Sequence, residues 1–167
     1  MRRIVVTVLL LALAVPSAAW ALRRAPGDGT LAVTRAEDYV AINIRGSVLG
    51  RTSGWIEIVD PKDGDCSAES VFGTRGPVRE SETKSGLLVC RYVGPVIRFR
   101  LVGGRQWIRI WGPDISISAV GRGEVWFQNR FDDRVGTYSF DGEKASPLPV
   151  KLTKFQLGVP LTSGGSG

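Results

Sequence analysis

PVIRFRLVGGRQWIRIWGPDISISAVGRGEVWFQN, residues 95–129, is the stretch that decides the expected fold. Together with Gly94 just before it, Gly103, Gly112 and Gly121 recur every nine residues. Nine residues accommodate one short strand and one tight turn, whereas a parallel connection needs a dozen residues or more. The period therefore predicts an antiparallel, up-and-down meander with a turn at each glycine.

Apolar residues alternate with polar ones inside each nine-residue unit. Residues two apart in a strand point to the same face of the sheet, so these positions predict one buried face. They are Ile97, Phe99, Leu101, Ile108, Ile110, Ile115, Ile117 and Ala119. In the last unit the apolar positions are displaced by one residue, to Val125 and Phe127. We expect a β-bulge, or the corner at residues 121–123, to accommodate the extra residue so that both side chains stay on the buried face.

The opposite side of these strands carries arginine and tryptophan. Neighbouring antiparallel strands bring such side chains together, so guanidinium groups can lie over indole rings and donate to carboxylate or phosphate groups. The candidate ligand-binding residues are Arg98, Arg100, Trp107, Arg109 and Trp111. We expect this Arg/Trp face to contact an anionic polymer or a glycan. The alternative is structural, with a second sheet covering the tryptophans and the arginines satisfying carbonyl or carboxylate groups at its rim.

The N-terminus has the order of a secretory signal peptide. Arg2 and Arg3 precede an apolar run at residues 4–15, and Ala19-Trp20-Ala21 is a small-x-small cleavage pattern. The apolar run is shorter than the roughly 20 residues that a membrane-spanning helix needs. We expect residues 1–21 to be removed, which leaves no stable membrane span and a periplasmic, cell-envelope or extracellular product.

Charge and composition restrict the partners and the chemistry. The chain has 22 Lys and Arg against 16 Asp and Glu, which favours anionic partners, and in an exported protein these are envelope polymers rather than nucleic acid. Histidine is absent, which excludes Ser-His and Cys-His nucleophiles and argues against a zinc or copper centre. Four acidic residues crowd residues 60–69 without the ligand order of a calcium loop. No metal and no cofactor are expected.

The rest of the chain also indicates strands. Past the signal peptide no helical period occurs, and about nine or ten short strands predict an all-β protein, a β-sandwich or flattened barrel, in one domain at residues 22–160. The Ser/Gly-rich residues 161–167 are expected to be disordered. Residues 55–61 and 107–113 share the pattern W-I-x-I-x-x-P, which fits either an ancient duplication or two strands that meet the same packing demands.

Cys66 and Cys90 form an even pair in an exported chain, so we expect a disulfide. The loop that it closes contains a polar stretch at residues 73–86, which predicts a surface excursion. One interpretation is a presented binding or inhibitory loop with the contact residues Arg75, Gly76, Pro77 and Arg79. The other is a connector without a partner.

One further run resembles a known group of proteins. Residues 114–127, DISISAVGRGEVWF, followed by GTYSFDG at 136–142 and PLP at 147–149, resemble small exported bacterial all-β proteins of uncharacterised function. The resemblance covers about a third of the chain. It implies an exported all-β domain, and no functional residue is carried over from it.

The function predicted from the sequence is therefore that of an exported, non-enzymatic binding or structural protein. The alternative is an inhibitor or partner-binding module that uses the disulfide-tethered loop. A third hypothesis, a glycan hydrolase, would have to use carboxylates alone, from Glu57, Glu124, Asp132 and Asp133.

Overall fold

The computed structural model describes residues 24–61, 64–66, 70–130 and 136–160, and the regular structure in these ranges is all β-strand. The strands are β1 (Gly29–Val59), β2 (Val71–Phe72), β3 (Arg79–Glu82), β4 (Leu88–Leu101), β5 (Arg105–Gln128), β6 (Thr137–Phe140), β7 (Ser146–Pro147) and β8 (Thr153–Leu157). Their pairings are antiparallel, so the all-β prediction is confirmed. The predicted signal peptide and the predicted C-terminal tail lie outside the described residues. No helix in these ranges could cross a membrane.

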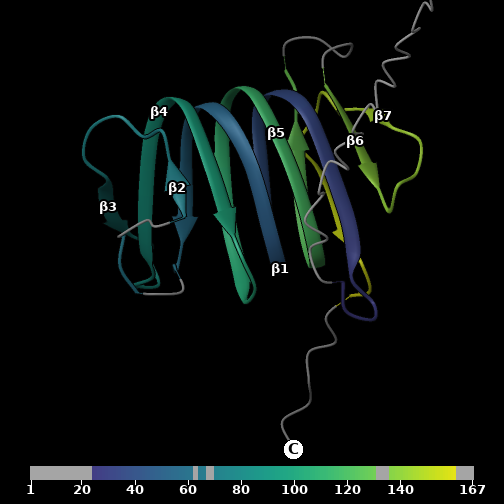
Figure 1. Ribbon diagram of the computed structural model, residues 1–167, viewed down its shortest axis with the longest axis horizontal. Coiled ribbons are helices and arrows are strands. Elements are labelled where there is room, and N and C mark those ends of the chain that lie inside the picture. Colours follow the sequence, from purple (N-terminus) through teal and green to yellow (C-terminus); the bar gives the residue numbers. More distant parts are fainter. Residues whose placement is uncertain (1–23, 62–63, 67–69, 131–135, 161–167) are drawn as a thin grey trace, which may run out of the picture.

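Three strands, β1, β4 and β5, are long and arch over, so that one sheet folds into two layers (Figure 1). Residues 39–45 of β1 pair with β5 on both sides, with residues 105–111 and with residues 122–128. Residues 46–51 of the same strand pair with residues 116–121 instead. Each long strand therefore passes from one layer to the other and contributes to both.

We name the two layers by their paired segments. Layer 1 contains residues 39–45 and 54–59 of β1, 88–94 of β4, and 105–112 and 122–128 of β5, with β3 and β8 at its edges. Layer 2 contains residues 29–36 and 46–52 of β1, 96–101 of β4 and 113–121 of β5, with β2, β6 and β7 beside them.

The nine-residue glycines mark passages between the layers rather than hairpin turns. β4 and β5 each pair with β1, which lies between them in the sheet, and this arrangement replaces the predicted meander of short strands. At one bend the backbones of β1 and β5 cross closely, where Gly54 and Gly112 have φ of 152° and 133°. A Cβ atom on Gly112 would lie 2.2 Å from the carbonyl oxygen of Ser53, so only glycine fits. Both a sharp bend and a tight turn can require glycine, because both can need a positive φ or a close backbone contact. The spacing of the glycines therefore does not show which of the two is present.

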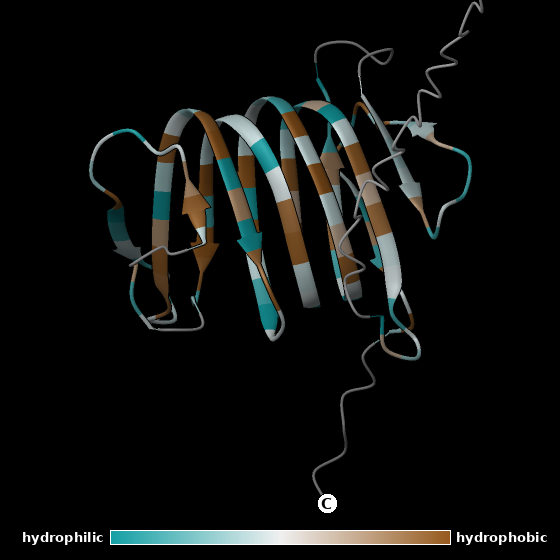
Figure 2. Cartoon of the chain, viewed as in Figure 1, coloured by the Kyte–Doolittle hydropathy of each residue, from teal (hydrophilic) through white to brown (hydrophobic). Residues whose placement is uncertain are grey.

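Inward side chains of both layers form one hydrophobic core. The predicted buried face is confirmed, since its members other than the half-buried Leu101 are at most 4% exposed. Val125 and Phe127 are fully buried, whereas Trp126 between them lies on the outside, as the displaced alternation predicts. β1 supplies a matching inward row with Val40, Ile42 and Ile44. Figure 2 shows the resulting alternation of apolar and polar residues along the arched strands.

The predicted disulfide is also confirmed. Cys66 and Cys90 are bonded, their Cα atoms are 5.4 Å apart, and both lie in the core. The hydroxyl of Tyr92 donates to the carbonyl oxygen of Cys66 at 3.2 Å. Closing the loop stabilises the folded chain by roughly 3.5 kcal/mol in the loop-entropy account.

The polar stretch inside this disulfide loop is held against β4. Strand β3 pairs with residues 88–91 of β4, and all four of its residues are exposed. The amide of Arg75 donates to the carbonyl oxygen of Val93 at 2.6 Å. The candidate partner residues Arg75, Gly76, Pro77 and Arg79 are accordingly exposed, on a segment anchored at both ends to the edge of layer 1.

Candidate functional site

The outer face of layer 1 carries all four tryptophans of the described residues. Trp55, Trp107, Trp111 and Trp126 are half-buried there, and each follows or precedes an inward residue of the core. The two W-I-x-I segments are direct neighbours, with Trp55 opposite Trp111 and Glu57 opposite Arg109. Directly opposed residues of antiparallel strands share a face, so their outward side chains meet.

Three of the aromatic side chains form a continuous row across neighbouring strands. The Trp55 and Trp111 rings stack with centroids 3.8 Å apart and an interplanar angle of 13°. The Tyr39 ring lies 4.8 Å from Trp111, and the guanidinium carbon of Arg91 lies 4.4 Å from the centre of Trp55. The ring faces in this row are largely occupied by one another.

An ion-paired cluster lies beside the aromatic row. Glu57 is only 5% exposed and bridges two arginines, with 2.5 Å to Arg91 and 3.0 Å to Arg109. Burial raises the pKa of the Tyr39 hydroxyl above its ordinary value; the positive charge of Arg109 opposes this rise and Glu57 adds to it. Arg109, predicted as a ligand-binding residue, is thus held by Glu57. The aromatic row and this cluster stabilise the layer together.

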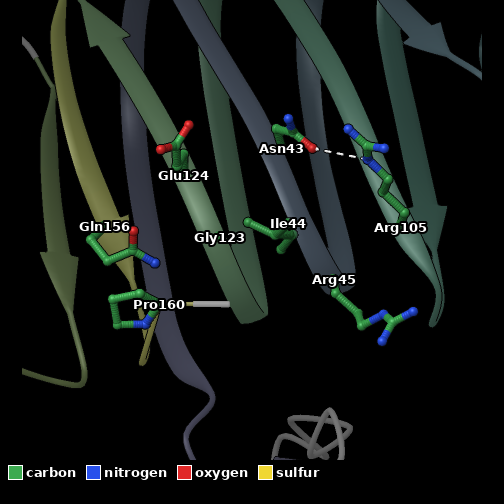
Figure 3. A pocket seen from close by; sticks show the side chains of 8 residues that line it. All are labelled: Asn43, Ile44, Arg45, Arg105, Gly123, Glu124, Gln156 and Pro160. Atoms are coloured by element: carbon green, nitrogen blue, oxygen red, sulfur yellow. Dashed lines mark hydrogen bonds between the residues drawn. The ribbon is translucent and has the colours of Figure 1, made fainter. Parts of the chain in front are cut away.

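A polar groove of about 440 Å³ opens at the other end of the same face (Figure 3). A row of four directly opposed residues crosses the layer here, one on each of four neighbouring strand segments. Its members are Gln156, Glu124, Asn43 and Trp107. The polar side chains that line the groove are those of Asn43, Arg45, Arg105, Glu124 and Gln156. The groove is thus lined by amide, carboxylate and guanidinium groups.

Trp107 and Trp126 lie on the same face as this groove, Trp107 opposite Asn43 and Trp126 two residues after Glu124, and their ring faces are less occupied than those of the aromatic row. Arg105 lies 5.9 Å from the centre of Trp107, and Lys154 lies 5.8 Å from the centre of Trp126. Neither indole stacks on another ring among the residues that the structure describes. Flat apolar rings beside converging polar groups are the usual composition of a small-molecule or sugar site.

The structure divides the predicted Arg/Trp face. Trp107, Arg109 and Trp111 lie together on the outer face of layer 1. Arg98 and Arg100 lie on the outer face of layer 2, where Arg98 is opposite Arg51 and Phe72. The division arises because β4 has already passed into layer 2 at these arginines, whereas β5 starts in layer 1. The expectation that all five side chains lie next to one another is therefore corrected.

Sequence reasoning missed most of the groove. An outward position for Asn43 and Arg45 could be predicted from the sequence, because they alternate with the apolar residues Val40, Ile42 and Ile44, which are buried. Their proximity to Arg105 and Gln156 depends on long-range pairing among β1, β5 and β8. A local alternation of apolar and polar residues does not predict which strands pair over a long range.

Of the four carboxylates named for the glycan hydrolase hypothesis, Glu57 and Glu124 lie in the described residues, each in an ion pair. Glu57 is held by two arginines, and Glu124 pairs with Lys154 at 2.5 Å. The two residues are three strand positions apart in layer 1, or about 14 Å of backbone separation, more than the 5–9.5 Å typical of glycosidase pairs. Asp132 and Asp133 lie outside the described residues. The structure groups no three acidic, cysteine or histidine side chains for a metal in the ranges that it describes.

Comparison with known proteins gives no relative, since no family model, curated protein or solved structure matches the chain.

Proposed function

We propose that this chain is an exported, non-enzymatic protein that binds glycan through the outer face of layer 1. The observation that carries the proposal is a polar groove on the same face as Trp107 and Trp126: Trp107 lies opposite the groove residue Asn43, and Trp126 follows the groove residue Glu124 by two positions. Sugar rings offer apolar C–H faces to indoles and hydroxyl groups to amides and carboxylates, and this groove offers both kinds of partner. A half-buried indole at a surface groove is also a strong anchor for a ligand.

Export is supported by the disulfide and by the signal-like N-terminus. Disulfides persist in oxidising compartments, where exported proteins fold. The non-enzymatic part of the proposal is supported by the ion pairs of Glu57 and Glu124, which leave neither carboxylate unpaired for proton transfer. The alternative of a loop-based inhibitor has only the exposure of β3 in its favour.

The test is retention of the purified protein on resins that carry soluble polysaccharides, with tryptophan fluorescence as a second readout. Because the described tryptophans all lie on one face, ligand binding there should shift their emission. Trp107→Ala and Trp126→Ala should each weaken retention by about tenfold or more.

The matched control is Phe72→Ala, which removes a 59%-exposed ring from the outer face of layer 2. Its retention should equal that of the wild type. Equal losses in all three variants, or unchanged retention in the tryptophan variants at unchanged melting temperature, would contradict the proposal.

A further inference from the structure

Two arginines of the groove, Arg45 and Arg105, belong to a row of three arginines on neighbouring strands. Arg45 lies directly opposite Arg105 on one neighbouring strand and opposite Arg122 on the other. Like charges in directly opposed positions of a sheet destabilise it. Such a row is therefore unexpected on structural grounds alone.

Only one member of this row has a carboxylate partner. Arg122 pairs with Asp28 at 3.0 Å. Within the described ranges no acid lies within ion-pair distance of Arg45 or Arg105, and Arg105 makes only a long 3.4 Å hydrogen bond to the Oδ1 atom of Asn43. Arg45 and Arg105 therefore carry positive charge that no ion pair with a described residue compensates, and their guanidinium groups extend in different directions (Figure 3).

The rest of the face behaves differently. Glu57 pairs with its two arginines, and Glu124 pairs with Lys154. Each charged side chain of these two clusters therefore has an ion-pair partner, whereas Arg45 and Arg105 have none among the described residues. These two arginines line the groove, and Trp107 lies opposite the groove residue Asn43.

We infer that the groove selects a glycan that carries an anionic group, a carboxylate or a sulfate, and that Arg45 and Arg105 bind this group. Guanidinium groups present paired N–H donors that match carboxylate and sulfate oxygens, and charge-assisted hydrogen bonds of this kind are the strong ones. Asn43 and Gln156 provide neutral donors and acceptors for neighbouring hydroxyl groups, and Trp107 provides the apolar surface. This inference rests on the proposed function and adds the ligand class.

The experiment compares glycans that share a backbone and differ in charge. One arm uses polygalacturonate against its methyl ester, and the other uses dextran sulfate against dextran, all at one ionic strength. The wild type should bind at least one anionic form about tenfold or more tightly than its neutral counterpart. The arm that shows the difference identifies the anionic group as carboxylate or sulfate.

The deciding variant is Arg45→Gln combined with Arg105→Gln. It should lose the anionic preference, keep the weaker binding to neutral glycan, and melt at or above the wild-type temperature because a like-charge contact is removed. The control, Arg79→Gln combined with Arg98→Gln, removes the same charge from exposed positions outside the groove and should keep the preference.

The outcomes separate the two claims. Equal wild-type binding to charged and neutral glycans overturns the inference while glycan binding stands. Equal loss of preference in the control and in the groove variant also overturns it, because net charge would then explain the effect. No retention of the wild type on any glycan overturns both.

Discussion

The outer faces of the two layers are made by the same strands and yet differ in chemistry. In layer 1 β5 presents Trp107, Arg109 and Trp111, whereas in layer 2 the same strand presents Ser116 and Ser118. The inward residues of both segments are buried isoleucines, so the core makes the same demand on each. The core alone therefore does not explain the difference, and this supports our choice of layer 1 as the side that binds the proposed ligand.

The bend between these two segments gives the largest expected effect. Gly112→Ala places a Cβ atom 2.2 Å from the Ser53 carbonyl at a φ of 133°, so both strain and overlap oppose folding. We expect a loss of about 3 kcal/mol in the free energy of unfolding, measured by urea denaturation with tryptophan fluorescence. Gly86→Ala is the control, since its φ is also positive and no atom lies within 4 Å of the added Cβ. Equal losses in the two variants would show that the crossing is looser than described.

Bends of this kind, in β4 as well as in β5, explain why the sequence predicted the core but not the site. Alternation is local, so Phe99, Ile108 and Ile117 were correctly placed inside. The layer to which each outward residue belongs depends on where a strand bends, and glycine indicates a turn and a bend equally. Arg98 was therefore assigned to the wrong face, while Trp107 was correctly grouped with Arg109.

The ion pairs of the two faces give the second comparison. Glu57 is buried between Arg91 and Arg109, whereas the Arg51–Asp114 pair of layer 2 spans 3.5 Å with about half of each side chain exposed. Glu57→Gln should cost about 2 kcal/mol, less than for a fully buried pair because both arginines are partly solvated. Asp114→Asn removes the same charge and should cost less than about 1 kcal/mol.

Denaturation of both variants at low and high salt measures this difference. Added salt should reduce the small loss in free energy of unfolding caused by Asp114→Asn. Most of the loss caused by Glu57→Gln should remain, because buried ion pairs are screened less. Similar losses for the two variants would mean that Glu57, although only 5% exposed, is not shielded from solvent.

Tyr39 gives the smallest expected effect and the finest test of that shielding. Burial raises the pKa of its hydroxyl above the ordinary value of 10.0, so the folded state favours the protonated phenol. Its contribution to stability is then fully present below pH 10 and is lost as the pH rises through the raised pKa. Tyr39→Phe keeps the ring beside Trp111 and removes the titration, so its melting temperature should fall less than that of the wild type above pH 10. If the melting temperatures of the wild type and Tyr39→Phe fell equally above pH 10, the Tyr39 hydroxyl would be exposed to water. The outer face of layer 1 would then be as accessible to solvent as the serine-bearing face of layer 2.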